Sequence, residues 1–253
     1  MRSFSRLVVN EWLKMSKKRS FFVPYALIAG VIALLLYLMS SFAPPEQTLS
    51  MLDLTAMVVS QNGMGQMLTF LAIICTAGVV AKEHSLGTIK LLLIRAQSRS
   101  KILASKYVAV LLFTLSICAF AFVVALLGGG AIFGFEVQGT SWSEVLQTLL
   151  YQLVYTIVYV TITFMVGIFT KSSGATIGIG MSLILLESLI VTLLSRYEIA
   201  KYLVFANTDL SVYLHGNPPM SGMSLTFSVL VLAAYMILFL AASFVTFKKR
   251  DVA

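Results

Sequence analysis

The sequence predicts an all-α integral membrane protein with six transmembrane helices, and three observations support this fold class. Hydrophobic residues make up 59% of the 253 residues, charged residues make up 11%, and the mean hydropathy is +0.95. Soluble domains carry roughly 25% charged residues. Six apolar stretches are long enough to cross a bilayer, and the basic residues fall almost entirely on one side of them.

The length of each apolar stretch defines the predicted spans. A bilayer core roughly 30 Å thick takes about 20 apolar residues in a helix, because backbone polar groups in hydrocarbon must bond within the helix. The stretches of this length are 21–42, 63–81, 107–127, 146–169, 174–195 and 225–247. The first stretch exceeds the roughly 7–15 residues of a signal-peptide apolar region, so we expect it to be retained. The whole chain, 1–253, is predicted to be a single transmembrane domain.

The distribution of charge predicts the orientation. Of the 18 Lys and Arg residues, all but Arg196 and Lys201 precede the first span, separate the second from the third, or follow the fourth or sixth. Six acidic residues occupy the opposite side: Glu46, Asp53, Glu136, Glu144, Glu198 and Asp209. The positive-inside rule makes the basic side cytoplasmic. We therefore expect a multi-pass protein of the cytoplasmic membrane with both termini inside.

The net charge of +8 does not indicate a nucleic-acid partner. Basic residues that bind nucleic acid form a stripe on a water-facing surface, whereas these lie in short gaps between apolar runs. Membrane lipid is the partner that such gaps favour.

Residues 1–20 are expected to form a helix that lies in the inner membrane interface. Apolar residues recur on one face of it at helical spacing: Phe4, Leu7, Val8, Trp12 and Met15. Glu11 falls inside this stripe, where a lone carboxylate is costly. Two alternatives remain open for it, namely contact with headgroups, Lys14 or Lys18, or contact with a basic residue of the segment 81–107.

The cytoplasmic loop 82–101, between the second and third spans, has an unusual pattern. From 85 to 94 it is apolar on nearly every side of a helix. Such a helix is shielded when the membrane covers one side and the groove of a soluble partner covers the other. The alternative is an ordinary loop whose positive charges fix the topology and touch anionic lipid.

Glu187 is an ionisable residue well inside the fifth span. Such residues face a bundle interior or a water-filled path. It is predicted either to contact substrate or protons on a translocation path, or to hydrogen-bond across helices to Ser or Thr. The following segment, 196–224, is expected to form short external helices.

Three segments share a specific order of residues. The first passes through Glu83, Gly87-Thr88-Ile89-Lys90, Arg95, Ser98-Arg99, Lys101 and Lys106-Tyr107; the second is FANTDLSVYL at 205–214; the third is FKKRDV at 247–252. The first resembles the first cytoplasmic loop of ABC-2-type permeases, the membrane subunits of bacterial ATP-binding-cassette transporters. The others are similar to the polar segment before the last span and to the C-terminal end of these permeases. Ala96 departs from the family, where Pro follows the Arg.

The resemblance implies the permease subunit of an ATP-binding-cassette exporter, with drug or peptide-antibiotic resistance as one common outcome in the family. Two permease chains, as a homodimer or with a paralogue, would work with two copies of a separate ATPase. The sequence contains no GxxxxGK[ST] loop, so ATP and Mg are expected on that ATPase. We expect this chain to be no enzyme, with no catalytic residue, metal or cofactor of its own.

The resemblance also places the ATPase contact on a coupling helix in the loop 82–101. The expected contact residues are Glu83, Leu86, Gly87, Thr88, Ile89, Lys90, Leu93 and Arg99. The alternative is a stand-alone six-helix secondary carrier or channel without an ATPase. Carriers usually show internal repeats with interrupted helices, and no repeat between the two halves is evident in the sequence. An intramembrane enzyme needs a nucleophile paired with a base, and the predicted spans show no such pair.

Overall fold

The computed structural model describes residues 2–42, 50–85, 98–136, 139–216 and 218–249, and within these ranges the chain is helical with no strand. The long helices are α2 (Val23–Phe42), α4 (Gln66–Ser85), α6 (Arg99–Phe133), α7 (Trp142–Thr170), α8 (Ser173–Leu194) and α9 (Leu225–Lys249). The shorter ones are α1 (Arg2–Ser16), η1 (Arg19–Phe21), α3 (Met51–Val59), η2 (Gln61–Gly65), η3 (Glu198–Tyr202), η4 (Val204–Ala206) and η5 (Ser211–His215).

Six helices of the described chain are long and apolar enough to cross a membrane, and each contains one predicted span or nearly all of it. The main difference is α6, which extends beyond the predicted span 107–127 at both ends. Ser98 caps its first turn by accepting a hydrogen bond from the Lys101 amide, and Gly134, with φ +86°, ends it. Helical hydrogen bonding thus continues through the polar residues 99–106 and the glycine-rich residues 128–133. The protein is a multi-pass membrane protein.

The six long helices differ in burial. The most buried is α7, which packs against α4, α8 and α9 and also touches α3 and α6. The least buried are α2, α8 and α9. Large apolar side chains remain exposed on the last two: Leu185, Leu186, Leu193, Leu230, Ile237 and Leu238. A patch of this kind suits a surface that faces lipid.

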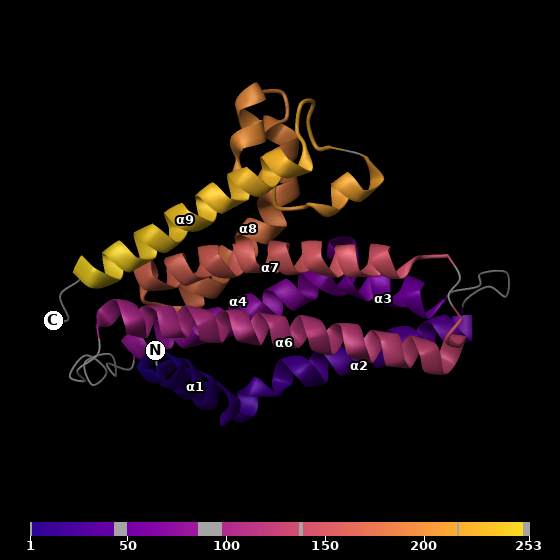
Figure 1. Cartoon of the computed structure of the whole chain (residues 1–253), viewed down its shortest axis with the longest axis horizontal. Coiled ribbons are helices and arrows are strands. Elements are labelled where there is room, and N and C mark those ends of the chain that lie inside the picture. The colour runs from indigo at the N-terminus through magenta and orange to yellow at the C-terminus, as the bar shows by residue number, and fades with distance from the viewer. Residues whose placement is uncertain (1, 43–49, 86–97, 137–138, 217, 250–253) are drawn as a thin grey trace.

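The first turn of α6 lies beside the N-terminal helix and the end of the last helix (Figure 1). In that view α1, the end of α4 and the end of α9 all lie at the end of the molecule where α6 begins. Contacts between α1 and α6 and between α6 and α9 agree with the view. At the far end of α8, the segment 196–224 holds the short helices η3 to η5, as expected, and Gly216, with φ +69°, ends η5.

The short helix α3 begins with a capping box. The Ser50 side chain accepts from the Asp53 amide, and Asp53 Oδ2 accepts from the Ser50 amide at 3.0 Å. The other oxygen, Asp53 Oδ1, accepts from the Thr140 amide at 3.2 Å and hydroxyl at 2.5 Å. Burial alone would raise the pKa of Asp53, but the hydrogen bonds from Thr140 and Ser50 outweigh it and hold that pKa below its ordinary value. Asp53 therefore joins α3 to the α6–α7 connection.

Removing this carboxylate is expected to destabilise the fold moderately. Asp53→Ala deletes half of the capping box and the acceptor for Thr140, so the free energy of unfolding should fall by about 1–2 kcal/mol. Chemical denaturation in detergent measures it. The matched control is Glu198→Ala at an exposed position, for which a change within about 0.5 kcal/mol is expected. Equal losses in the two variants would contradict the role given to Asp53.

Candidate functional site

Two clusters of residues contain predicted site residues. The first, which we call the basal junction, comprises Glu11, Lys14, Arg99, Lys106 and Lys248, at the end of the molecule where α6 begins. The second, which we call the Glu187 pocket, lies between α4, α7, α8 and the segment 205–219.

Glu11 binds two lysines in the basal junction. Its Oε2 accepts from Lys106 Nζ at 2.8 Å, and its Oε1 accepts from Lys14 Nζ at 2.7 Å. The side chains of Glu11 and Lys106 are 9% and 5% exposed, while Lys14 is 45% exposed. The predicted contact with a basic residue of 81–107 is confirmed, and the contact with Lys14 exists beside it. A buried ion pair thus ties α1 to the first part of α6.

Two opposing effects act on the Glu11 carboxyl group. Burial raises its pKa, because desolvation disfavours the charged form. The Lys106 ammonium and the hydrogen bonds from Lys106 and Lys14 lower it, and together they hold the pKa of Glu11 below its ordinary value.

This lowered pKa predicts how stability depends on pH. In an unfolded chain the pKa of Glu is about 4.3. The ion pair therefore stabilises the fold at pH values above this pKa. The stabilisation is lost as the pH falls through the lower pKa of Glu11 in the folded state. The melting temperature of the wild type should exceed that of Glu11→Gln by a constant margin from about pH 6 to 8. The margin should shrink below about pH 4.

Circular dichroism melts of the two proteins in detergent measure this margin. Asp53 has a lowered pKa as well, but it titrates in both proteins and cancels in the difference. A margin that stays the same down to about pH 3 would contradict the stabilising charge on Glu11.

Of the other residues predicted near this end, three lie in the described part of the chain and six lie outside it. Trp12 packs edge-on against Phe21, with ring centroids 5.5 Å apart. Arg99 Nη1 donates to the Lys248 carbonyl at 3.4 Å, which joins the start of α6 to the end of α9. Glu83 lies in the last turn of α4. The predicted contacts outside the described residues are Leu86, Gly87, Thr88, Ile89, Lys90 and Leu93.

Glu187 is buried, at 7% exposed, and three hydroxyl groups hold it. Its Oε2 accepts from the Tyr155 hydroxyl and the Tyr159 hydroxyl, both at 2.8 Å. Its Oε1 accepts from the Thr208 hydroxyl. The predicted hydrogen bond to a Thr therefore exists, but its donor comes from the segment after η4, and two tyrosines of α7 supply the rest.

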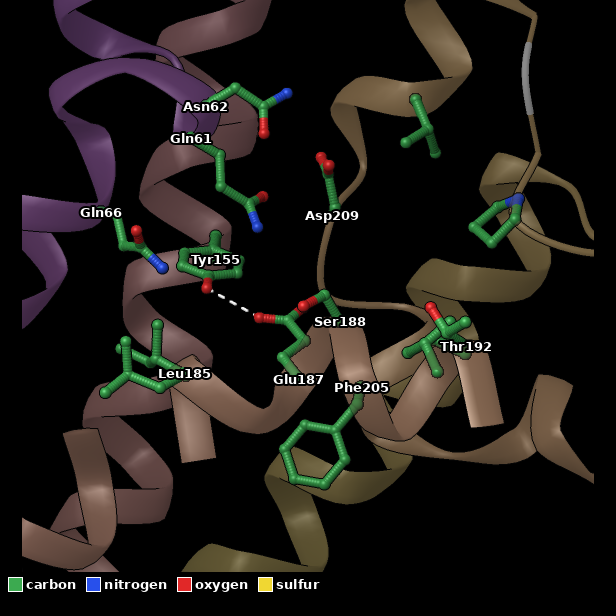
Figure 2. Close-up of a pocket in the computed structure, with 15 residues that line it drawn as sticks. Gln61, Asn62, Gln66, Tyr155, Leu185, Glu187, Ser188, Thr192, Phe205 and Asp209 are labelled. Carbon is green, nitrogen blue, oxygen red and sulfur yellow. Dashed lines mark hydrogen bonds between the residues drawn. The ribbon is translucent and has the colours of Figure 1, made fainter. Parts of the chain in front are cut away.

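The Glu187 pocket is a cavity of about 510 Å³, and Figure 2 shows side chains from several elements around it. Gln61, Asn62 and Gln66 come from the start of the second span, opposite Glu187 and Asp209. The chain bends at Gly63, whose φ of −102° and ψ of −125° are not helical. A side chain on Gly65 would collide with the Ser60 carbonyl and with Gln152. Two glycines thus permit the bend where the three amide side chains reach the pocket.

Sequence reasoning did not identify most of these pocket residues. Tyr155 and Tyr159 are four residues apart and so share one face of α7, a spacing that could have marked them as partners for a buried carboxylate. Thr208 and Asp209 gave no comparable signal, because they belong to a segment without regular periodicity.

Comparisons with known proteins give a family and two relatives. The family model described as "Protein of unknown function (DUF2705)" matches residues 17–253. The chain is 35% identical over 198 residues to "Uncharacterized protein YhcI" of Bacillus subtilis (strain 168), a match that covers 72% of this chain and 63% of YhcI. The chain thus spans less than two thirds of that relative. It is 28% identical over 203 residues to "Uncharacterized membrane protein YdbK" of the same organism, covering 74% of this chain and 78% of YdbK.

Proposed function

We propose that this chain, which belongs to the DUF2705 family of proteins of unknown function, is the permease subunit of an ABC-2-type ATP-binding-cassette exporter. It moves its substrate across the cytoplasmic membrane with energy from ATP, which a separate ATPase subunit binds with Mg and hydrolyses. Two permease chains and two ATPase subunits form the transporter, and both permease termini face the cytoplasm.

The basal junction is the observation that carries this proposal. The expected ATPase contacts run from Glu83, in the last turn of α4, to Arg99, the first residue of α6. The start of α6 is fastened to α1 by Glu11 and Lys106 and to α9 by Arg99 and the Lys248 carbonyl. A partner that displaces the loop would therefore act on three helices together, which is what a two-state transporter requires.

A chain of contacts also joins α6 to the Glu187 pocket. Tyr107, next to Lys106, shares a 2.8 Å hydrogen bond with Thr161 of α7, and its ring meets Phe164 with centroids 5.2 Å apart. The same helix carries Tyr155 and Tyr159, which hold Glu187. A movement of the first turns of α6 can therefore reach the pocket through packed side chains and hydrogen bonds.

Co-purification with a candidate ATPase tests the proposal. The chain is tagged and co-expressed with an ATPase that carries a GxxxxGK[ST] loop and is encoded beside its gene. The wild type should retain the ATPase, and Glu83→Lys or Gly87→Trp should insert normally but retain about tenfold less. The control Glu198→Lys makes the same charge change in the segment 196–224 and should retain as much as the wild type. Failure of the wild type to retain any ATPase would favour a stand-alone carrier.

A further inference from the structure

The Glu187 pocket differs in charge from the rest of this basic chain. Its lining includes two carboxylates, Glu187 and Asp209, and no Lys, Arg or His among the described residues. A second cavity of about 410 Å³ shares Asn62, Asp209 and Val212 with it and adds a third carboxylate, Glu144. The described lining of this cavity also lacks a basic residue. The two adjoining cavities therefore favour a positively charged occupant.

The lining of the Glu187 pocket also specifies the kind of cation. Ile184, Leu185 and Phe205 supply apolar surface, while Gln61 and Gln66 supply amides that can donate or accept. A volume of about 510 Å³ is within the range of small-molecule sites, roughly 300–1,000 Å³. Among the described residues, no group of three or more His, Cys, Asp or Glu gathers as metal ligands would. An organic cation with an apolar body fits these walls better than a metal ion does.

Glu187 is already held in position for such a ligand. The Tyr155 and Tyr159 hydroxyls bind one carboxylate oxygen, and the Thr208 hydroxyl binds the other. These bonds fix the side chain on the pocket wall, as Figure 2 shows for Tyr155. A preorganised charge loses little conformational entropy when a ligand binds. Because Glu187 is buried, its attraction for a cation is screened less than that of a surface carboxylate.

We propose that the Glu187 pocket binds the ammonium or guanidinium group of an amphipathic organic cation, with Glu187 and Asp209 as its charge partners. The amides of Gln61 and Gln66 orient the ligand, and the apolar wall covers its body. Binding itself requires no ATPase. The identification of this ligand as the transported compound rests on the proposed function.

Two probes that share a dansyl body and linker, one charged and one neutral, test the proposal. Dansylcadaverine carries a primary ammonium group, and its N-acetyl derivative is neutral. The purified chain is placed in nanodiscs of phosphatidylcholine, which has no net charge to attract the cation, and dansyl fluorescence is titrated without ATPase. The wild type should bind the cation saturably and about tenfold more tightly than the neutral probe, because a hydrogen bond between charged groups, which the neutral probe cannot make, contributes about that much.

Three variants locate the site. Glu187→Gln and Asp209→Asn should each weaken binding of the cation about tenfold and leave the neutral probe unchanged. Glu198→Gln, which removes an acidic residue outside both cavity linings, should bind like the wild type. If Glu187→Gln unfolds in a thermal melt, Asp209→Asn decides the outcome. Equal affinity of the wild type for both probes, or undiminished binding by the folded pocket variants, would overturn the proposal.

The result is separable from that of the co-purification test. If the ATPase is not retained but the charge-dependent binding is observed, the permease assignment fails and the site stands. If the ATPase is retained and the two probes bind alike, the permease assignment stands and the cation site fails.

Discussion

Replacing Glu11 with Leu is expected to lower the free energy of unfolding by about 3–5 kcal/mol. The side chain of Lys106 is 5% exposed, and its ammonium group would stay buried after losing the Glu11 carboxylate. Removing both charges should be much less harmful, because an apolar pair avoids the desolvation that the ions require. The double variant Glu11→Leu/Lys106→Met should therefore recover at least half of the loss.

The buried thiol of Cys118 and the partly buried thiol of Cys75 provide the measurement, since a thiol-reactive dye labels them as the chain unfolds in denaturant. Lys14→Met is the matched control. Lys14 contacts the same carboxylate but is 45% exposed, so its loss should cost less than about 1 kcal/mol. A Glu11→Leu loss as small as that of the control would show that the ion pair does not stabilise the contact between α1 and α6.

Replacing Glu187 with Leu should cost about 2–4 kcal/mol. The substitution removes the acceptor that the Tyr155 and Tyr159 hydroxyls share, and a buried hydroxyl that loses its acceptor is destabilising. Tyr155→Phe and Tyr159→Phe should each cost about 1 kcal/mol, because the other tyrosine still binds Oε2. Together they should cost more than the sum, because Oε2 then loses both donors.

The same denaturant titration measures this series. Glu198→Leu changes an exposed carboxylate and should shift the free energy of unfolding by less than about 0.5 kcal/mol. Strict additivity of the two tyrosine variants would contradict a shared role in holding Glu187.

The number and type of long helices could be predicted from the sequence because the bilayer sets their length. Helix ends were less predictable, since the apolar stretch 107–127 is only the middle of α6. The helix α3 was missed because nine residues are too few for a span. Its signal was present, since Ser50 and Asp53 have capping-box spacing before apolar residues.

The two buried carboxylates were identified in the sequence, but only some of their partners were. Helical spacing puts Glu11 on the face of α1 that contacts α6. Its partner Lys106 therefore lies in the basic segment 81–107, which was one of the two predicted alternatives. For Glu187, a Thr partner was expected, whereas the position of Thr208 depends on how the chain turns back after α8. Such a return has no period that sequence patterns could reveal.

ATP hydrolysis by the reconstituted complex tests most directly whether a separate ATPase drives this protein. The ATPase is assayed alone, with the wild-type chain in lipid vesicles, and with the Glu83→Lys variant at the same protein density. We predict that the wild type changes the hydrolysis rate several-fold and that Glu83→Lys leaves it close to that of the ATPase alone. A rate that is the same with and without the wild-type chain would contradict the permease assignment.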